Sequence, residues 1–429
     1  MAIARPSGTT EVDVLVVGGG PSGSTAAYHL ARHGVNVLLV DRAAFPREKV
    51  CGDGLTPRAV VALASMGVDL DDPGFARVNG LRTYGPGVVL ELPWPTLQSF
   101  PDFGLVRTRH DLDDLLLRHA ANAGAHVWER AEAVAPVDDR GWVVGATVRR
   151  LPAGGSGNGE ERRGDGVEEV RARFVLAADG ASSRFAGRAG VRRDRTRPLG
   201  IAARRYVRTE RPLQPWFEAW LDVWDGDTLL PGYGWMFPVR GGVVNVGAGL
   251  LNTFRGFGDY SARRVFDVFL RNLPPDWAID EDHAEGPVLS GPLPMGMNRR
   301  PLATPGMLVI GDAGGIVNPF NGEGIAYAME SAEMAAELVY EAMAKWRPGL
   351  AHVYPTALRE RYGRYFAMGR LFVRLIGDPR IMRFATQHGL SREWVMRWAM
   401  KVMANLSDGR DGDPGDRLFW AMERLAPAS

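Results

Sequence analysis

The first part of the chain alternates short apolar runs with segments of small residues. Val12 to Val17 is a valine-rich run, followed by glycines and then by an alanine-rich stretch from Ser24 to His33. Val35 to Val40 is a second apolar run, which ends in Asp41. Short apolar runs bounded by glycine predict buried strands, and the longer segment between them predicts a helix. Residues 12–41 therefore predict a β-α-β unit with parallel strands.

Two kinds of β pattern follow. Trp142 to Arg149 and Val167 to Leu176 are strand-like, and the polar, glycine-rich stretch from Ala153 to Gly166 between them predicts a mobile hairpin tip. Between about residues 195 and 290, alternating runs with frequent glycine and proline predict an antiparallel sheet in a separate lobe. Examples of such runs are Trp220 to Trp224 and Gly242 to Leu250.

The last part of the chain is predicted to be helical. The helical pattern begins at Ile325, is interrupted at Pro355 and near Pro379, and has a polar break from Ser407 to Asp416.

Composition excludes several classes of protein. The chain has 51 Lys and Arg and 50 Asp and Glu, so it lacks the overall positive field that favours nucleic acid. The single cysteine, Cys51, excludes an internal disulfide framework, and we assign no metal ligands. The first ten residues lack the pattern of a secretory signal, so we expect a cytoplasmic protein. No apolar run approaches the roughly 18 residues of a spanning helix, so any membrane contact should be peripheral.

A glycine string lies between the first predicted strand and its helix. Gly18-Gly19-Gly20-Pro21-Ser22-Gly23 matches G-x-G-x-x-G in the context that dinucleotide binding requires. We expect Gly18 to permit a tight turn, Gly20 to let the backbone approach a pyrophosphate, and Gly23 to let helix and strand pack closely. Pro21 and Ser22 begin the helix, whose free amides face the phosphates. Asp41, with Arg42 beside it, is placed to bind the ribose hydroxyls. A purely structural turn is the alternative.

A second motif, far along the chain, favours FAD over NAD. Val309 to Gly315 (VIGDAGG) is followed by Asn318 to Ile325 (NPFNGEGI). A strand that runs into Gly311-Asp312 would place the carboxylate on a ribityl hydroxyl, although Asp312 could also act as an N-cap. The helix that starts at Gly322 to Ile325 would stabilise negative charge at flavin N1 and O2. The residues assigned to the cofactor here are Gly311, Asp312, Pro319, Gly322, Gly324 and Ile325.

Two further elements complete this set of motifs. Asp179-Gly180 follows the buried run Phe174 to Ala177, and Arg109-x-x-Leu112-Asp113 opens a helix that reaches His119. Together the four motifs resemble the FAD-dependent oxidoreductase superfamily that includes para-hydroxybenzoate hydroxylase. The resemblance implies that Asp179 and Gly180 lie near FAD and that Arg109 contacts it. For Asp179 a structural salt bridge with Arg184 is the alternative.

This resemblance implies an α/β fold (α+β overall) with a Rossmann-type FAD-binding domain, an antiparallel-sheet substrate domain and a C-terminal helical region. We expect a discontinuous FAD-binding domain formed by residues 11–70, 101–190 and 288–345. The substrate-binding cap domain would comprise residues 71–100 and 191–287, and the helical region residues 346–429.

The segment after the second strand narrows the class of flavoenzyme. Within Phe45 to Leu55 (FPREKVCGDGL), the residues from Lys49 resemble the K-x-C-G-[DG]-G-L element of the geranylgeranyl reductase family. Tyr233 to Pro238 (YGWMFP) resembles the Y-x-W-x-F-P strand of the same family, and Val402 to Leu406 resembles actinobacterial menaquinone reductases, which saturate one isoprene unit of the quinone tail. The chain departs from the usual family form at Gly314, where alanine is common, and in the insertion around residues 154–166.

Reduction of an isolated alkene requires hydride at one carbon and a proton at the other. Positive character at the tertiary carbon could be stabilised by aromatic faces. Tyr233, Trp235 and Phe237 alternate along their predicted strand, so all three should lie on one side of it, and we assign them to catalysis. Core packing is the alternative explanation. Trp220 and Trp224, on one strand face with Asp222, are expected to extend the same apolar wall.

The resemblance also implies that the loop from Phe45 to Leu55 runs toward the flavin. Lys49, Cys51 and Gly52 are therefore assigned to the cofactor, and Cys51 is also a candidate for proton delivery. A buried cysteine is more often an inert small hydrophobe, and Lys49 could be a solvated charge.

The C-terminal region combines basic and apolar residues, a pattern that fits a substrate located in a membrane. Arg359 to Lys401 contains ten basic and three acidic residues. Interleaved with them are the apolar residues Phe366, Leu371, Phe372, Ile376, Met382, Phe384, Trp394 and Trp398, with Met403 just beyond. Basic amphipathic helices can bind an anionic membrane surface. An ordinary helical layer over the flavin domain, with its arginines extended to water, is the alternative.

The sequence therefore predicts an FAD-dependent prenyl reductase that acts on a polyprenyl lipid, with the menaquinone tail as the leading substrate. Geranylgeranyl diphosphate and an archaeal-type phospholipid are alternative substrates. An FAD monooxygenase of the same fold and a non-catalytic flavin-binding or membrane-scaffold protein are the alternative functions, since fold alone does not decide between them. No second G-x-G-x-x-G is present for NADPH, so an external reductant such as NAD(P)H or a ferredoxin is expected.

Overall fold

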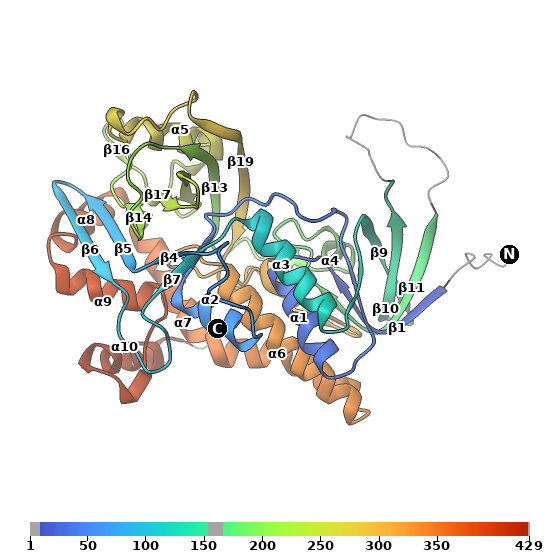
Figure 1. Cartoon of the computed structure of the whole chain (residues 1–429). Helices are drawn as coiled ribbons and strands as arrows, with labels where there is room; N and C mark the ends of the chain where they lie inside the picture. Colours follow the sequence, from blue (N-terminus) through green and yellow to red (C-terminus); the bar gives the residue numbers. More distant parts are fainter. Residues whose placement is uncertain (1–8, 153–165, 428–429) are drawn as a thin grey trace.

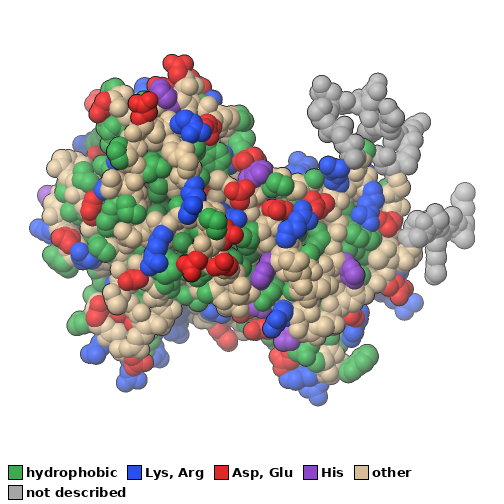
Figure 2. Space-filling model, in the orientation of Figure 1, with side chains coloured by type: hydrophobic (Ala, Val, Ile, Leu, Met, Phe, Trp, Pro, Cys, Tyr) green, Lys and Arg blue, Asp and Glu red, His purple; other side chains and the backbone are tan. Residues whose placement is uncertain are grey.

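The computed structural model describes residues 9–152 and 166–427. Two large sheets lie next to each other, and the C-terminal helices pack below and beside them (Figure 1). The expected hairpin tip lies outside the described residues except for Gly166. Acidic, basic and apolar side chains are intermingled over the visible face, in keeping with the formal net charge of +1 (Figure 2).

The first sheet has eight strands and contains the predicted β-α-β unit. Parallel pairing joins β1 to β2 and β11, β2 to β8, and β11 to β22, while β9 and β10 form an antiparallel extension at β11. Its strands are β1 (Thr9–Val17), β2 (Val37–Val40), β8 (His126–Trp128), β9 (Ala131–Asp139), β10 (Trp142–Arg150), β11 (Val167–Ala177), β21 (Ala303–Thr304) and β22 (Met307–Val309). We call it the nucleotide sheet.

Helices cover the nucleotide sheet, and α1 packs against both α3 and α6 (Figure 1). The buried faces of α1, α3 and α6 share one core cluster with strand residues such as Val14, Leu39 and Leu308. The helices associated with this sheet are α1 (Pro21–Arg32), α2 (Pro57–Ser65), α3 (Arg109–Asn122), α4 (Arg184–Arg188) and α6 (Ile325–Ala344), with the 3-10 turn η3 (Gly311–Gly314).

Two glycines of the first motif are required by close backbone contacts. Gly18 has φ +107°, and a Cβ atom there would lie 2.4 Å from the carbonyl oxygen of Ala178. A Cβ atom on Gly23 would lie 1.8 Å from the carbonyl oxygen of Gly18. The tight turn and the close helix–strand packing expected from the sequence are therefore both present.

The second sheet has seven strands in the order β19-β13-β18-β17-β14-β5-β6, and we call it the substrate sheet. All its pairings are antiparallel except that of β14 with β5. Helix α5 (Ala262–Asn272) covers one face. The strands are β5 (Gly80–Gly85), β6 (Val88–Pro93), β13 (Leu199–Arg208), β14 (Trp216–Trp220), β17 (Gly232–Pro238), β18 (Val243–Leu251) and β19 (Ala284–Pro294).

The expectation of one strand from Trp220 to Trp224 is wrong. Trp220 ends β14, the chain bends, and Trp224 begins the short strand β15 (Trp224–Asp225), which pairs with β16 (Thr228–Leu229). Trp220 packs beneath α5, where its ring stacks on Tyr84 at 4.2 Å between ring centroids. The two tryptophans therefore do not share a strand face, and Trp220 does not extend the aromatic wall of β17.

Short strands join the two main sheets. A three-stranded sheet consists of β3 (Gly54–Leu55), β4 (Ala76–Val78) and β7 (Gly104–Val106), and a two-stranded sheet of β12 (Arg192–Arg193) and β20 (Arg299–Arg300). Strand β19 continues in the substrate sheet to Pro294, beyond the boundary expected at residue 288. The exact division into three domains remains a proposal.

The C-terminal region is helical and breaks at the expected places. Pro355 lies in the first turn of α7, Pro379 begins α8, and the polar segment from Ser407 separates α9 from α10. The helices are α7 (Tyr354–Ile376), α8 (Pro379–Gly389), α9 (Glu393–Met403) and α10 (Pro414–Leu425). The remaining 3-10 turns are η1 (Phe257–Asp259), η2 (Pro275–Trp277), η4 (Pro348–Val353) and η5 (Gly409–Asp411).

The close contact at Gly23 gives a first prediction. Gly23→Ala should lower the unfolding temperature and abolish FAD binding, because its Cβ atom would overlap the carbonyl oxygen of Gly18. Overpacking of this kind costs ~1–3 kcal/mol or more. Gly187→Ala in α4 is the matched control, because a Cβ atom there meets nothing within 4 Å. Thermal unfolding with flavin absorbance measures both effects, and an unchanged Gly23→Ala protein would contradict the prediction.

Candidate active site

The aromatic side chains of β17 lie on the face of the substrate sheet opposite α5. Ring centroids are 5.8 Å apart for Tyr233 and Trp235 and 6.4 Å apart for Trp235 and Phe237. Gly234, which alternates with them, faces Phe269 of α5 on the other side. The expected common side of the three rings is therefore present, and we call them the aromatic face.

Glycines on neighbouring strands make room for the aromatic face. In the register of β17 and β18, Trp235 is opposite Gly247 and Tyr233 is opposite Gly249. A Cβ atom on Gly247 would lie 2.2 Å from the ring of Trp235. Facing residues of adjacent strands project to the same side, so the indole ring occupies the space that a side chain at Gly247 would fill.

The loop from Phe45 to Leu55, which we call the motif loop, packs directly on the aromatic face. A Cβ atom on Gly52 would lie 3.1 Å from the ring of Phe237 and 3.3 Å from Nε1 of Trp235. A Cβ atom on Gly54 would lie 3.0 Å from the ring of Phe217. The rings thus contact the loop that the sequence places toward the flavin, as well as each other.

A buried carboxylate, Asp53, fixes the motif loop. It has φ +67°, a left-handed conformation, and its side chain is fully buried. Its Oδ2 accepts hydrogen bonds from the hydroxyl of Tyr206 at 2.6 Å and from Nδ2 of Asn245 at 2.7 Å, and its Oδ1 accepts one from the amide of Arg109 at 3.1 Å. Burial raises the pKa of Asp53 to about 6, although the hydrogen bonds from Tyr206 and Asn245 oppose this shift.

Asn245 and Arg204 attach the rest of the loop to the substrate sheet. Nδ2 of Asn245 also donates to the carbonyl of Cys51 at 2.8 Å, and its Oδ1 accepts from Nε1 of Trp235 at 3.0 Å. The buried Arg204 donates to the carbonyl of Lys49 at 3.0 Å and to Glu48 at 2.7 Å. One amide side chain therefore links the aromatic face and the motif loop.

Lys49 and Cys51 face the expected cofactor site. Burial lowers the pKa of Lys49, while Asp312 raises it, and its ammonium lies near Gly180. Burial raises the pKa of Cys51, although the neighbouring guanidinium of Arg109 opposes this shift. The thiol therefore carries its proton at neutral pH, and Lys49 is a half-buried group facing Asp312 rather than a fully solvated loop side chain.

The first turn of α1 presents a site suited to a pyrophosphate. Helix α1 begins after Gly20, and the tips of Arg47 and Arg109 approach Gly20, at 3.7 and 3.9 Å from the position of a Cβ atom there. Both guanidinium groups are held by the fully buried Asp113, which lies 3.1 Å from Arg47 and 2.6 Å from Arg109. Helix amides and fixed guanidinium groups are the donors that phosphates require, so these residues fit the cofactor.

Residues of the other cofactor motifs converge on the same region. Gly311 packs against Ser22, because a Cβ atom there would lie 2.6 Å from its hydroxyl oxygen. Asp312 lies beside Gly324, with its Oδ1 3.3 Å from the Cβ position, and Ile325 begins α6. Asp312 is not the N-cap of α6, since Gly324 occupies that position. Pro319 packs against Gly369 of α7 and supports this turn from behind.

Three other predicted residues have different partners. Asp41 accepts hydrogen bonds from the amides of Gly19 at 2.7 Å and Ala43 at 2.8 Å, so it holds the glycine turn at the expected ribose position. Arg42 next to it is exposed. Asp179 accepts from the amide of Phe185 at 2.8 Å, and no ion pair with Arg184 occurs within the described part of the chain. The salt-bridge alternative for Asp179 is therefore wrong.

Sequence reasoning missed several residues of this site: Arg47, Asp53, Arg204, Tyr206, Asn245 and Glu323. Asn245 could have been found, because Asn245, Gly247 and Gly249 alternate with the apolar residues of β18 and so mark a second, different face. The partners of Asp53 could not have been found from the sequence. They depend on the pairing of β13 with β18, which places Tyr206 next to Asn245 and joins segments far apart in the sequence.

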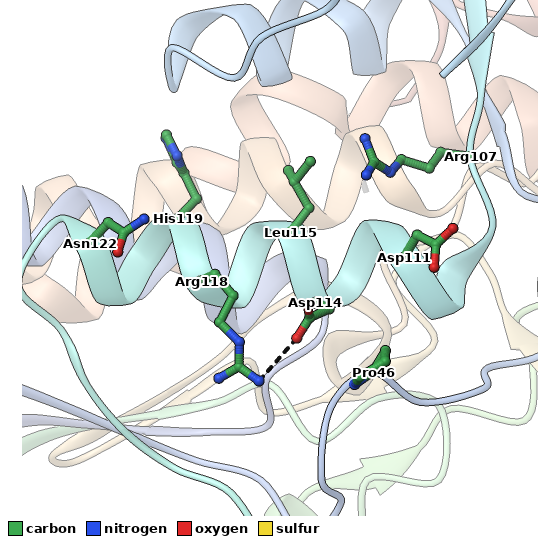
Figure 3. Close-up of a pocket in the computed structure, with 8 residues that line it drawn as sticks. All are labelled: Pro46, Arg107, Asp111, Asp114, Leu115, Arg118, His119 and Asn122. Carbon is green, nitrogen blue, oxygen red and sulfur yellow. Dashed lines mark ion pairs between the residues drawn. The ribbon is translucent and has the colours of Figure 1, made fainter. Parts of the chain in front are cut away.

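A separate pocket of about 420 Å³ lies on the outer face of α3. Its lining comprises Pro46, Arg107, Asp111, Asp114, Leu115, Arg118, His119 and Asn122 (Figure 3). The face of α3 that carries Arg109 and Asp113 points the other way, toward α1. Arg118 pairs with Asp114 at 3.1 Å and Arg107 with Asp72 at 2.8 Å, so the pocket offers no unpaired positive charge to an anion.

Comparison with known proteins gives one family. The family model described as FAD binding domain matches residues 11–349. The menaquinone reductase of Mycobacterium tuberculosis is 37% identical over 426 residues, which cover 97% of this chain and 98% of that protein. The digeranylgeranylglycerophospholipid reductase of Thermoplasma acidophilum is 30% identical over 357 residues, covering 82% and 84%.

Solved structures agree with this result. A geranylgeranyl bacteriochlorophyll reductase-like protein from Thermoplasma acidophilum has a TM-score of 0.75 at 25% identity, covering 92% of this chain and 96% of that chain. A flavin-dependent brominase has a TM-score of 0.69 at 18% identity, covering 97% and 99%, and this likeness shows the fold alone.

The guanidinium groups at Gly20 give a second prediction. Arg47→Met should weaken FAD binding about tenfold or more, because a hydrogen bond to a charged group contributes ~1.5–3 kcal/mol. Arg32→Met, at the exposed far end of α1, is the control and should bind FAD normally. Fluorescence titration of the apoprotein with FAD measures both dissociation constants, and equal values would exclude Arg47 from the pyrophosphate site.

Proposed function

The chain belongs to the FAD-binding flavoprotein family that contains the menaquinone and digeranylgeranylglycerophospholipid reductases, and we propose that it uses FAD to hydrogenate a polyprenyl lipid. The substrate that best fits the relatives is the tail of menaquinone. The observation that carries the proposal is the packing of the aromatic face on the motif loop, next to the residues that fit the cofactor.

Bound FAD in its reduced form would supply hydride to one alkene carbon. The chain's own residues would exclude water and stabilise the charges that develop during the reaction. The buried Trp235 and the half-buried Phe237, both packed against Gly52, would exclude water and present aromatic faces to positive charge at the other carbon. Lys49 and the amide groups of the first turn of α6 would stabilise negative charge on the reduced cofactor. An external electron donor would reduce the cofactor.

An apolar cluster supports the approach of a long prenyl chain. Leu251, Met295, Val317 and Val373 form it, and Phe372 and Ile376 of α7 pack against it. Met295 also approaches Gly322 at 3.7 Å from the Cβ position. The cluster thus connects the end of α7 with the turn beside the aromatic face, and we propose this as the side from which the tail enters.

The surface at the end of α7 and on α8 favours a membrane. Leu371 and Phe384 are 59% and 66% exposed. Residues 371–392 contain four arginines, all exposed, and a single acidic residue, Asp378. By contrast, Phe366 and Met382 of the expected set are buried in the helical layer. Because this surface is both apolar and basic, we propose that it attaches the protein to an anionic membrane. No helix within residues 9–152 and 166–427 is long and apolar enough to cross a bilayer.

The proposed reaction is tested by mass spectrometry of the quinone. Chemically reduced enzyme, incubated with menaquinone without oxygen, should yield a product with two additional hydrogen atoms in the tail for each bond reduced. Oxidised enzyme is the control. Oxygen incorporation into an aromatic substrate, coupled to NAD(P)H consumption and without tail reduction, would instead indicate a monooxygenase.

Membrane attachment is tested by sedimentation with vesicles of anionic phospholipid. The protein should sediment with them and be released by salt, because each arginine near an anionic surface contributes ~1 kcal/mol. Leu371→Ser combined with Phe384→Ser should weaken this binding, whereas Leu418→Ser, an exposed position on α10, should not. Equal recovery in the supernatant with and without vesicles would contradict the proposal.

A further inference from the structure

Glu323 lies in the turn that separates the aromatic face from α6. It stands between Gly322 and Gly324, immediately before the helix. The hydroxyl of Tyr233 donates to the carbonyl of Asn321 at 2.8 Å, and its oxygen is 3.9 Å from the Cβ position of Gly322. The turn that carries Glu323 is therefore held next to the aromatic face, in the segment whose residues fit the flavin.

The two carboxyl oxygens of Glu323 have different surroundings. The hydroxyl of Thr56 donates to Oε1. Thr56 is the N-cap residue of α2, yet its side chain does not cap the helix and turns to Glu323 instead. Oε2 is buried and has no hydrogen-bond partner among the residues described. A buried carboxyl oxygen without a donor strongly disfavours the charged form, so this oxygen is the natural position for a proton.

The charged groups around Glu323 do not hold it as a carboxylate. Arg58 is the nearest cation, but it pairs with Glu330 at 2.7 Å and donates to the carbonyl of Asn405 at 3.0 Å. The other facing groups are the phenols of Tyr233, Tyr327 and Tyr365. Burial raises the pKa of Glu323 to about 7, and Glu330 raises it further, while Thr56, Arg58 and the side chain of Asn321 oppose the shift. Such a group is an effective general acid near neutral pH.

We propose that Glu323 is the acid that protonates the alkene, a role that rests on the reductase function proposed above. The π bond of the alkene breaks as one carbon receives hydride from the reduced cofactor and the other receives the proton of Glu323. The alkene is thereby reduced, the cofactor is oxidised, and Glu323 is left as a carboxylate that takes its next proton from solvent.

The neighbouring acids are less suited to this step. The pKa of Tyr233 is raised well above its ordinary value by burial, and its proton is engaged by the carbonyl of Asn321. Burial likewise raises the pKa of Cys51, so its thiol is a weak acid. Glu323 is the group of the three whose acidity matches neutral pH.

The direct test follows the tail-saturated product by mass spectrometry in a single turnover, because the quinone head group can itself reoxidise the flavin without reduction of the tail. Enzyme reduced chemically and mixed with menaquinone without oxygen should form this product at a rate that falls as pH rises through about 7. Glu323→Gln should retain FAD and lose about 100-fold or more of this rate, since a positioned acid contributes 10²–10⁴-fold. Glu337→Gln, exposed on α6, the helix that follows Glu323, is the control and should react normally. A Glu323→Gln rate within about threefold of wild type would overturn the proposal.

Thermal unfolding of the holoenzyme tests the protonation state without turnover. Because the folded pKa lies above the ordinary value of 4.5, folding becomes less favourable as pH rises from there to about 7. Glu323→Gln should therefore unfold at a higher temperature than wild type at pH 8 and show no such gain at pH 4.5. An equal difference at both values would show that folding does not shift the pKa of Glu323 and would overturn the proposal.

A second variant tests the proposed role of Glu323 if the Glu323→Gln protein does not bind FAD. Thr56→Val removes a hydrogen bond that favours the carboxylate, so the midpoint of the pH–rate profile should move upward. An unchanged midpoint would overturn the proposal. If wild-type enzyme forms no tail-saturated product from menaquinone, the proposed function fails and the role of Glu323 falls with it. If wild type reacts and Glu323→Gln reacts equally, only the role of Glu323 fails.

Discussion

The site depends on the hydrogen bonds that Asp53 accepts. A carboxylate buried without donors would be strongly destabilising, but Tyr206, Asn245 and the amide of Arg109 together satisfy both of its oxygens. Two of these donors come from the substrate sheet and the third from the first residue of α3, on the nucleotide side. One side chain in a left-handed conformation therefore connects both parts of the protein to the motif loop.

This connection explains why the rest of the loop is fixed. Asn245 also binds the carbonyl of Cys51 and the indole of Trp235, and Arg204 binds the carbonyl of Lys49. The loop therefore cannot shift without breaking bonds to the sheet that carries the aromatic face. Precise placement of reacting groups contributes strongly to catalysis, and the loop places a cation and a thiol beside the residues that fit FAD.

Much of this could be predicted from the sequence. The β-α-β unit, the helix from Ile325 and the common side of the three aromatic rings follow from local periodicity and glycine spacing, which fix the backbone over short distances. FAD followed from the order of four motifs, which the matched family model confirms, and the reductase family followed from the motif loop and the strand of the aromatic face, which the relatives confirm.

The remainder depends on contacts between distant segments. The sequence did not predict the bend after Trp220. An alternating pattern of five residues fits both a continuous strand and a strand end that is followed by a turn. The partners of Asp53 and Glu323 were missed because each lies in another element: Tyr206 and Asn245 in β13 and β18, and Thr56 before α2. Periodicity shows which face of an element is buried, but it does not show which element covers that face.

The central claim is that Asp53 and its donors act as one unit that holds the motif loop for the cofactor. A double-mutant cycle on FAD affinity tests it most directly, with Asp53→Asn, Tyr206→Phe and the double variant titrated with FAD. The account predicts that each single change weakens binding and that the double variant is little worse than Asp53→Asn, a coupling of ~1 kcal/mol or more. Independent, additive effects of the two changes, or FAD affinity unchanged by Asp53→Asn, would contradict it.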